Sequence, residues 1–297
     1  MRSEITRVAA LQLRVTASRS DNLARAAALI ARAASEGASF VALPEVFTGS
    51  YGVDHFAKWQ EEVPEGYRGM KYEAWETSLS GAAMMAEESL RHGITVTGGV
   101  VERGDDGHLF NSMPIYKDGI LLRTYRKVHL SRVLGVTSES DVFTAGDAPC
   151  SVGVPSSDGG GFELGMACCF DLRFPAFLGL YGPHVRREGP SERPSKGVDA
   201  ICAPSAFLDV TGGPHWDLLL RRTALDQQAY VIAPNVAYDG SNAVPLHGRS
   251  AICDPWGDIV AQCSAAGDDI AIAEMSAARL SEVRSKLPLE ALCRLDV

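Results

Sequence analysis

Apolar positions along this chain follow two different spacings. Residues 8–13 and 40–43 are short apolar runs of strand length, and residues 23–35 between them have the spacing of an alanine-rich amphipathic helix. The polar triplet at 20–22 precedes that helix as a cap, and Gly37 follows it as a stop signal. The pattern therefore predicts a strand, a helix and a second strand at the start of the chain.

The same alternation continues downstream. Asp118 and Gly119 separate two apolar runs, which predicts a β-hairpin with an Asp-Gly turn. Further strands are predicted at 94–100, 111–116, 120–125, 200–203, 230–235, 248–253, 259–263 and 268–273, and helices at 72–92, 176–181, 216–228 and 277–285. Paired strands mixed with helices, and no repeat of fixed period, indicate an α/β or α+β sandwich.

Two stretches lack such spacing. Residues 130–148 carry few apolar pairs and many small polar residues, so they are predicted to form a surface loop near a site. Residues 183–197 are rich in arginine and proline, which indicates an exposed insertion. With 297 residues, the chain is interpreted as one domain, residues 1–297, that carries this insertion.

Composition narrows the choice of partners. A net charge of −9 argues against nucleic acid or an anionic membrane as the main partner, and no apolar run is long enough to cross a bilayer. The seven cysteines are odd in number and form no C-x-x-C pair, which favours reduced thiols and a cytoplasmic location. No Walker or G-x-G-x-x-G loop and no metal-ligand spacing occur, so we expect neither a cofactor nor a metal ion.

Residues 162–175 are the most informative stretch. A short apolar strand leads into Cys168 and Cys169, and Asp171, Arg173 and Pro175 follow before the next apolar run. A thiol at such a strand-to-helix turn faces free N–H groups and the positive end of a helix dipole. Side chains alternate along a strand, so only one of the two thiols is expected to point at the site. Cys169 lies nearer the turn, but the spacing leaves the choice open, as it leaves open that both are merely buried apolar residues.

Two other polar residues also stand at predicted strand ends. Glu45 ends the run at 40–43, and Lys127 follows the predicted hairpin. A thiol nucleophile needs a base, and a cation stabilises the charge that develops on a substrate oxygen. Each residue alone is equally compatible with a solvated surface position, but together they suggest a nucleophilic enzyme.

The chain resembles the nitrilase superfamily of carbon-nitrogen hydrolases. The resemblance rests on the segments at 43–47, 125–130 and 169–175, supported by 111–112, 139–147, 204–207, 213–216 and 254–257, in the family order. It implies a four-layer αββα sandwich that pairs into a homodimer or a higher homo-oligomer through outer helices. It also implies a triad of Glu45, Lys127 and Cys169, with Glu139 as an auxiliary carboxylate near the lysine. In the mechanism that this implies, the oxyanion is held by Lys127 and the backbone N–H of Phe170.

Within that family, residues 170–173 resemble the amidase and carbamoylase side, and residues 20–22, 50–52 and 283–288 resemble omega-amidases. That likeness implies release of ammonia from a small dicarboxylate monoamide such as 2-oxoglutaramate or 2-oxosuccinamate. Arg173 is then expected to bind the distal carboxylate, Tyr51 to line or hydrogen-bond within the pocket, and Phe207 to form its wall.

Several departures keep other substrates open. Residues 213–217 and Arg249 differ from the usual family pattern, and residues 204–207 equally resemble a deaminated-glutathione amidase. Hydrolysis of an N-carbamoyl amide is a further alternative within the superfamily. From a different class, Cys168 beside Cys169 allows a non-catalytic or redox-sensing binding protein. His129 and His215 are interpreted as structural hydrogen-bonding residues.

Overall fold

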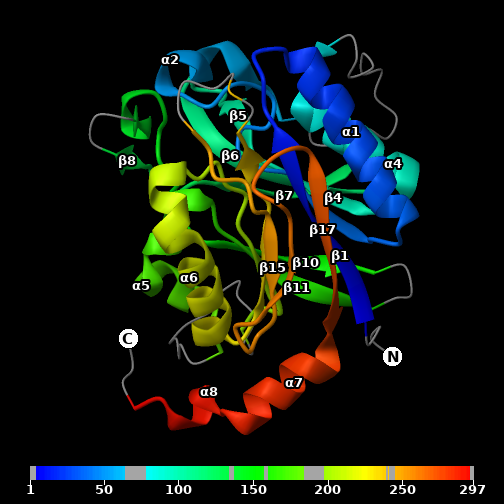
Figure 1. Ribbon diagram of the computed structural model, residues 1–297, viewed down its shortest axis with the longest axis vertical. Coiled ribbons are helices and arrows are strands. Elements are labelled where there is room, and N and C mark those ends of the chain that lie inside the picture. The colour runs from blue at the N-terminus through cyan, green and yellow to red at the C-terminus, as the bar shows by residue number, and fades with distance from the viewer. Residues whose placement is uncertain are drawn as a thin grey trace.

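Two β-sheets pack face to face between two layers of helices in the computed structural model (Figure 1), which describes residues 5–63, 78–133, 137–156, 160–183, 197–238, 240 and 245–294. Helices α1 (Arg19–Ser35) and α4 (Gly81–His92) cover the outer face of the first sheet. Helices α5 (Pro175–Leu178) and α6 (Asp209–Gln227) lie on the opposite side, against the second sheet. The predicted four-layer αββα sandwich is therefore confirmed.

The first sheet joins strands from both ends of the chain. Its hydrogen-bonded path runs β14, β1, β2, β4, β6, β5 and β3, while β17 pairs with β1 and β7 pairs with β6. The strands are β1 (Ile5–Arg14), β2 (Phe40–Ala42), β3 (Gln60–Glu61), β4 (Thr95–Thr97), β5 (Val100–Arg103), β6 (Leu109–Lys117), β7 (Ile120–Arg126), β14 (Val236–Ala237) and β17 (Asp269–Ser276). The parallel pairs β1–β2 and β2–β4 bring the carboxyl ends of these strands to one edge.

The second sheet is built from the middle of the chain. Its order is β10 (Cys150–Pro155), β11 (Gly161–Met166), β12 (Ala200–Cys202), β13 (Tyr230–Ala233), β15 (Ala251–Cys253) and β16 (Ile259–Gln262). The remaining described elements are β8 (Arg132–Val133), β9 (Thr137–Ser138), α2 (Val53–Phe56), α7 (Ala277–Lys286), α8 (Leu289–Leu292) and the 3₁₀ turns Ala57–Trp59, Glu139–Asp141, Cys169–Arg173 and Gly179–Tyr181. Parallel pairing of β11, β12 and β13 aligns a second set of strand ends.

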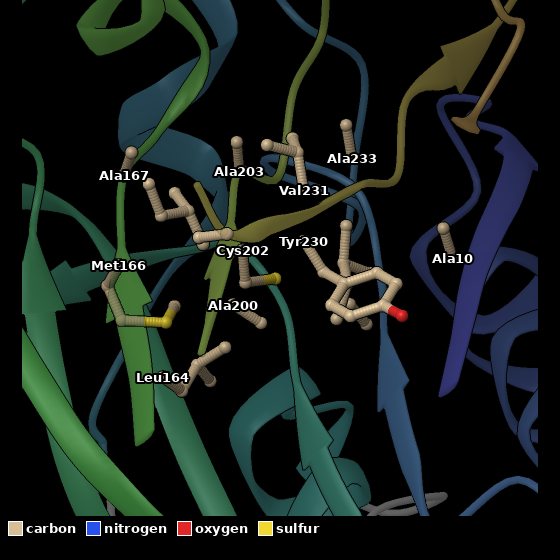
Figure 2. Close-up of a cluster of buried hydrophobic side chains, with 14 of the residues drawn as sticks. Ala10, Leu164, Met166, Ala167, Ala200, Cys202, Ala203, Tyr230, Val231 and Ala233 are labelled. Carbon is tan, nitrogen blue, oxygen red and sulfur yellow. The ribbon is translucent and has the colours of Figure 1, made fainter. Parts of the chain in front are cut away.

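The core follows from strand alternation. Val8 and Ala10 of β1 face the second sheet, whereas Ala9 and Leu11 pack with residues of α1 and α4. Figure 2 shows the inter-sheet layer, in which Met166 of β11 and Cys202 of β12 lie among other buried apolar side chains. Because the first sheet is covered on both faces, its strands read as continuous apolar runs instead of alternating ones.

Most predicted elements are present, with informative differences. The hairpin is confirmed: Asp118 and Gly119 both have positive φ, as a type I′ turn requires. The strand predicted at 94–100 is split between β4 and β5, because Gly99 passes so close to Glu45 that a Cβ would lie 2.6 Å from the Glu45 Cα. The helix predicted at 216–228 begins at Asp209, and Gly212 inside it packs directly on His247.

Two predictions fall partly or wholly outside the described residues. Of the helix predicted at 72–92, the structure describes α4 and leaves 72–77 outside. The insertion at 183–197 lies outside apart from its two end residues, so its exposure and the single-domain interpretation stay predictions. In the part of the chain that the structure does describe, no helix is long and apolar enough to cross a membrane.

Candidate active site

The three predicted catalytic side chains meet where the two sheets abut. Glu45 follows β2 and Lys127 follows β7 in the first sheet, while Cys169 follows β11 in the second. The backbone joins the two sides, because the Cys169 N–H donates to the Pro204 carbonyl and the Glu45 N–H donates to the Ser205 carbonyl. Strand ends from both sheets therefore position one site.

Lys127 lies between two carboxylates. Its Nζ is 2.8 Å from Glu45 Oε1 and 2.7 Å from Glu139 Oε2, and all three side chains are fully buried. An ammonium has three N–H donors, so this pairing leaves one for another acceptor. The auxiliary carboxylate expected at Glu139 is thus found beside the lysine.

Neutral donors complete the coordination of both carboxylates. Asn111 Nδ2 donates to Glu45 Oε1 at 2.8 Å and to Glu139 Oε1 at 3.2 Å. Glu139 also accepts from the Tyr51 hydroxyl at 3.0 Å and from the Ser131 N–H at 2.6 Å. Buried charges are tolerated when they are paired and hydrogen-bonded in this way.

The electrostatics of the cluster favour a neutral thiol at rest. Burial alone would lower the pKa of Lys127, but Glu139 and Glu45 outweigh it and hold the pKa well above its usual value. Burial, together with Glu45, raises the pKa of Cys169 well above that of a free thiol, although Lys127 opposes the shift. Two carboxylates and one ammonium already leave the cluster with a net negative charge, so a thiolate requires that its proton move onto a neighbouring carboxylate.

The turn that carries Cys169 is strained and firmly held. Cys169 has φ +44°, a left-handed conformation that costs a non-glycine residue about 1–3 kcal/mol. Asp171 fixes the turn, since its carboxylate accepts from the Cys168 N–H at 2.8 Å, the Tyr125 hydroxyl at 2.6 Å and the His129 N–H at 2.9 Å. His129 also stacks on Phe174, in keeping with a structural histidine.

Only one thiol, that of Cys169, lines the pocket, but the Cys168 thiol also contacts the buried cluster. Cys168 Sγ lies 3.2 Å from Glu45 Oε1, and Cys169 lines the adjoining pocket. Alternation fails because β11 ends at Met166 and the backbone then turns through the left-handed conformation of Cys169. Cys168 is fully buried and does not line the pocket, whereas Cys169 does.

The pocket beside Cys169 has an aromatic wall and a cation. Its lining residues are Tyr51, Ser131, Cys169, Phe170, Arg173, Ala206, Phe207, Leu208 and Thr211. The Arg173 guanidinium lies over the rings of Phe207 and Phe170, at 5.1 and 5.6 Å from their centroids, and Nη1 contacts His215 Nδ1 at 3.2 Å. Burial lowers the pKa of Arg173, and within the described residues no carboxylate pairs with it.

Sequence reasoning missed the residues that orient the cluster. Asn111 and the Ala206 N–H both donate to Glu45, and Asp171 holds the turn. One signal for Asn111 was present, namely a polar amide inside a mostly apolar strand, 109–117. Nothing in the sequence pattern points to Ala206, because its contribution is a backbone N–H. In the described part of the chain, no group of three or more His, Cys, Asp or Glu side chains is arranged to hold a metal ion.

Comparison with known proteins shows the family to which the chain belongs. The profile of the carbon-nitrogen hydrolase family matches residues 7–285, so the chain belongs to that family. It is 29% identical to the omega-amidase NIT2 of Mus musculus over 296 residues, covering 98% of this chain and 96% of that protein. It is 31% identical to NIT2-A of Xenopus laevis over 292 residues, covering 97% and 94%.

The fold agrees with that assignment. The crystal structure of Saccharomyces cerevisiae Nit3, a member of the nitrilase superfamily, superposes with a TM-score of 0.77 at 29% identity, covering 97% of this chain and 96% of that one. The chain is therefore a hydrolytic enzyme that acts on carbon-nitrogen bonds, an amidase of the nitrilase superfamily.

Proposed function

We propose that this amidase hydrolyses the side-chain amide of a small dicarboxylate monoamide, such as 2-oxoglutaramate or 2-oxosuccinamate, through a thioester on Cys169. The observation that carries the proposal is the pocket itself, in which the Cys169 turn and the Arg173 cation line one cavity. The likeness to omega-amidases at about 29% identity supports the same substrate class.

The proposed reaction begins with proton transfer from Cys169 to Glu45. The sulfur attacks the amide carbon, and the tetrahedral oxyanion is stabilised by Lys127 and by the backbone N–H of Phe170. The free donor of the Lys127 ammonium supports this role, as does the place of Phe170 in the first turn of the 3₁₀ segment, where N–H groups lack helical partners.

Collapse of the intermediate breaks the carbon-nitrogen bond. Protonated Glu45 returns its proton to the departing nitrogen, ammonia leaves, and the acyl group stays on Cys169 as a thioester. Water then attacks the thioester with Glu45 again as base, and the carboxylic acid is released as the thiol re-forms. Throughout, the proton moves between neighbouring groups, so the net charge of the buried cluster is unchanged before water enters.

We assign substrate choice to the part of the pocket around Arg173, Phe207 and Tyr51, which we call the mouth. A half-buried guanidinium is a strong partner for a carboxylate, and Arg173 has aromatic rings beside it and the His215 ring nitrogen at one edge. Phe207 and Tyr51 supply the walls. A substrate with an anionic group a few bonds from its amide therefore suits the pocket.

A homo-oligomer is proposed from the outer face of α6. Val210, Leu218 and Leu225 lie on this helix at near-heptad spacing and are 73%, 66% and 52% exposed. Exposed apolar residues that share one helix face are typical of a subunit contact. Leu218→Glu is expected to convert the oligomer to monomer in size-exclusion chromatography with light scattering.

A cytoplasmic location remains a prediction of the sequence.

The test is ammonia release from a panel of amides. The panel contains 2-oxoglutaramate, 2-oxosuccinamate, deaminated glutathione, an N-carbamoyl amino acid and a neutral aliphatic amide, each with wild type and Cys169→Ala. We expect turnover of the two small oxo-amides, and its loss in the variant by about 10⁴-fold or more. Preference for deaminated glutathione or the carbamoyl compound would change the proposed substrate and leave Cys169 as the proposed nucleophile. No turnover of any amide would overturn the proposal.

A further inference from the structure

Glu45 carries an uneven set of hydrogen bonds on its two oxygens. Oε1 accepts from Lys127 Nζ at 2.8 Å, from Asn111 Nδ2 at 2.8 Å and from Cys168 Sγ at 3.2 Å. Oε2 accepts from the Ala206 N–H at 2.8 Å. A carboxylate oxygen offers about two lone pairs, so Oε1, with three donors, is fully occupied, whereas Oε2 retains room for one more donor.

Oε2 is held beside the pocket that contains the nucleophile. The Ala206 N–H donates to Oε2, and Ala206 and Cys169 line the same pocket. We therefore assign Oε2, which has an unused lone pair, as the oxygen that takes the Cys169 proton.

The second cysteine is held so that it faces only Glu45. Its N–H is fixed by Asp171 at 2.8 Å, and its side chain is fully buried outside the pocket. Burial and the Glu45 charge raise the pKa of Cys168 well above that of a free thiol. Cys168 therefore stays an S–H donor and is not a second thiolate.

We propose that Cys168 is a positioning residue, whose thiol is a third donor to Glu45 Oε1 and so helps to direct proton transfer from Cys169 to Oε2. This inference rests on the proposed function of Glu45 as the base. A donor to the ionised carboxylate also disfavours its protonation, which extends the active form of the base to lower pH. Loss of the Cys168 thiol should therefore change the pH dependence of the reaction, even though Cys168 is not the nucleophile.

The test compares variants that keep or lose the donor at Cys168. Cys168→Ala and Cys168→Val both remove it, one with a smaller and one with a larger side chain, while Cys168→Ser keeps an O–H donor. Cys253→Ala is the matched control, because Cys253 is an equally buried thiol in β15 that does not line the site. Thermal unfolding of each variant identifies any that fail to fold.

Two readouts are measured against pH: kcat/KM for the best amide, and the rate at which iodoacetamide alkylates Cys169, located by peptide mapping. We expect both Ala and Val to move the acidic limb of each profile to higher pH by roughly half a unit to one unit, as fits one weak hydrogen bond to a carboxylate. KM should stay within about twofold, because Cys168 does not touch the pocket. Cys168→Ser and Cys253→Ala should keep the wild-type limb.

Each outcome supports or contradicts the role proposed for Cys168. An acidic limb in Cys168→Ala and Cys168→Val that coincides with wild type, or a serine variant that shifts as alanine does, would overturn the inference and leave the amidase proposal intact. If wild type turns over no amide, the alkylation profile still reports the role of the thiol. If activity survives Cys169→Ala and is lost in Cys168→Ala, Cys168 is the nucleophile, and both proposals fail in their present form.

Discussion

The buried cluster and the mouth of the pocket are built on opposite principles. Glu45, Lys127 and Glu139 are fully buried, and each charge meets an opposite charge and further hydrogen-bond donors. Arg173, only a few residues after Cys169, is half-buried and is surrounded by two aromatic rings and a histidine ring nitrogen, with no carboxylate paired to it among the described residues. Each charge in the cluster is paired without a ligand, whereas the Arg173 cation at the mouth is available to pair with an anionic ligand. Changes in the cluster should therefore affect kcat and stability, and changes at the mouth should affect KM.

The largest expected effect is that of Glu45→Gln. The amide keeps the size of the side chain but cannot accept the Cys169 proton, so kcat/KM should fall by about 10²–10⁴-fold. KM should change little. The decrease is measured by ammonia release, and alkylation of Cys169 should slow in parallel because the thiol loses its base.

A suitable control is Glu61→Gln. Glu61 is also buried and ion-paired, with Arg19 at 2.6 Å, but it lies in β3, where its carboxylate accepts from the Ala82 N–H of α4, and it does not line the pocket. Its replacement should alter stability and leave kcat/KM near wild type. Glu45→Gln with more than about a tenth of wild-type activity would contradict the role of Glu45 as base.

Lys127→Met should have the largest effect on stability. It leaves two buried carboxylates without their counter-ion, which typically costs about 3–5 kcal/mol. Urea denaturation measures the loss. Lys286→Met is the control, because it breaks only an exposed surface pair with Glu282, which solvent screens. A loss for Lys127→Met no larger than that of the control would contradict the buried-pair interpretation.

The same variant gives a pH prediction. The folded-state pKa of Lys127 is raised, so its contribution to stability is fully present below the unfolded pKa of about 10.4 and is lost only as pH rises through the higher folded value. The difference in unfolding free energy between wild type and Lys127→Met should therefore not shrink between neutral pH and about pH 9. A difference that shrinks across this range would show that the ammonium is not stabilised as described.

At the mouth, Arg173→Met should act on binding. Loss of one charge-assisted contact should raise KM for an anionic amide by about ten- to a hundredfold, and leave KM for a neutral amide and kcat for both nearly unchanged. Steady-state kinetics with both substrates measure the split. An equal rise in KM for the neutral amide would mean that Arg173 shapes the pocket and does not read charge.

The contrast between the cluster and the mouth also shows which features of the fold and the site can be predicted from the sequence alone. The positions of most strands, the hairpin and the strand ends that carry Glu45, Lys127 and Cys169 follow from local spacing and turn chemistry. The orientation of Cys168 does not, because it depends on the positive φ of its neighbour. Nor does the Ala206 N–H, because a backbone donor leaves no trace in the residue type. That no carboxylate among the described residues pairs with Arg173 depends on distant elements brought together, and spacing along the chain does not encode it.

The smallest effect expected here is that of Tyr51→Phe, which tests where the two regions meet. The Tyr51 ring lines the pocket, but its hydroxyl donates to Glu139 Oε1 at 3.0 Å, an atom that also accepts from Asn111 at 3.2 Å. Losing one of two neutral donors costs about 0.5–1.5 kcal/mol, so kcat should fall about two- to tenfold.

KM should stay constant in this variant, because the ring that faces the substrate is retained. Burial and Glu139 raise the pKa of Tyr51 well above its usual value, so the phenol stays protonated and the profile between pH 6 and 9 should keep its shape. Steady-state kinetics at several pH values give all three quantities. A tenfold rise in KM with kcat unchanged would instead assign the hydroxyl to substrate binding, and would place Tyr51 with Arg173 at the mouth and not with Glu139 in the cluster.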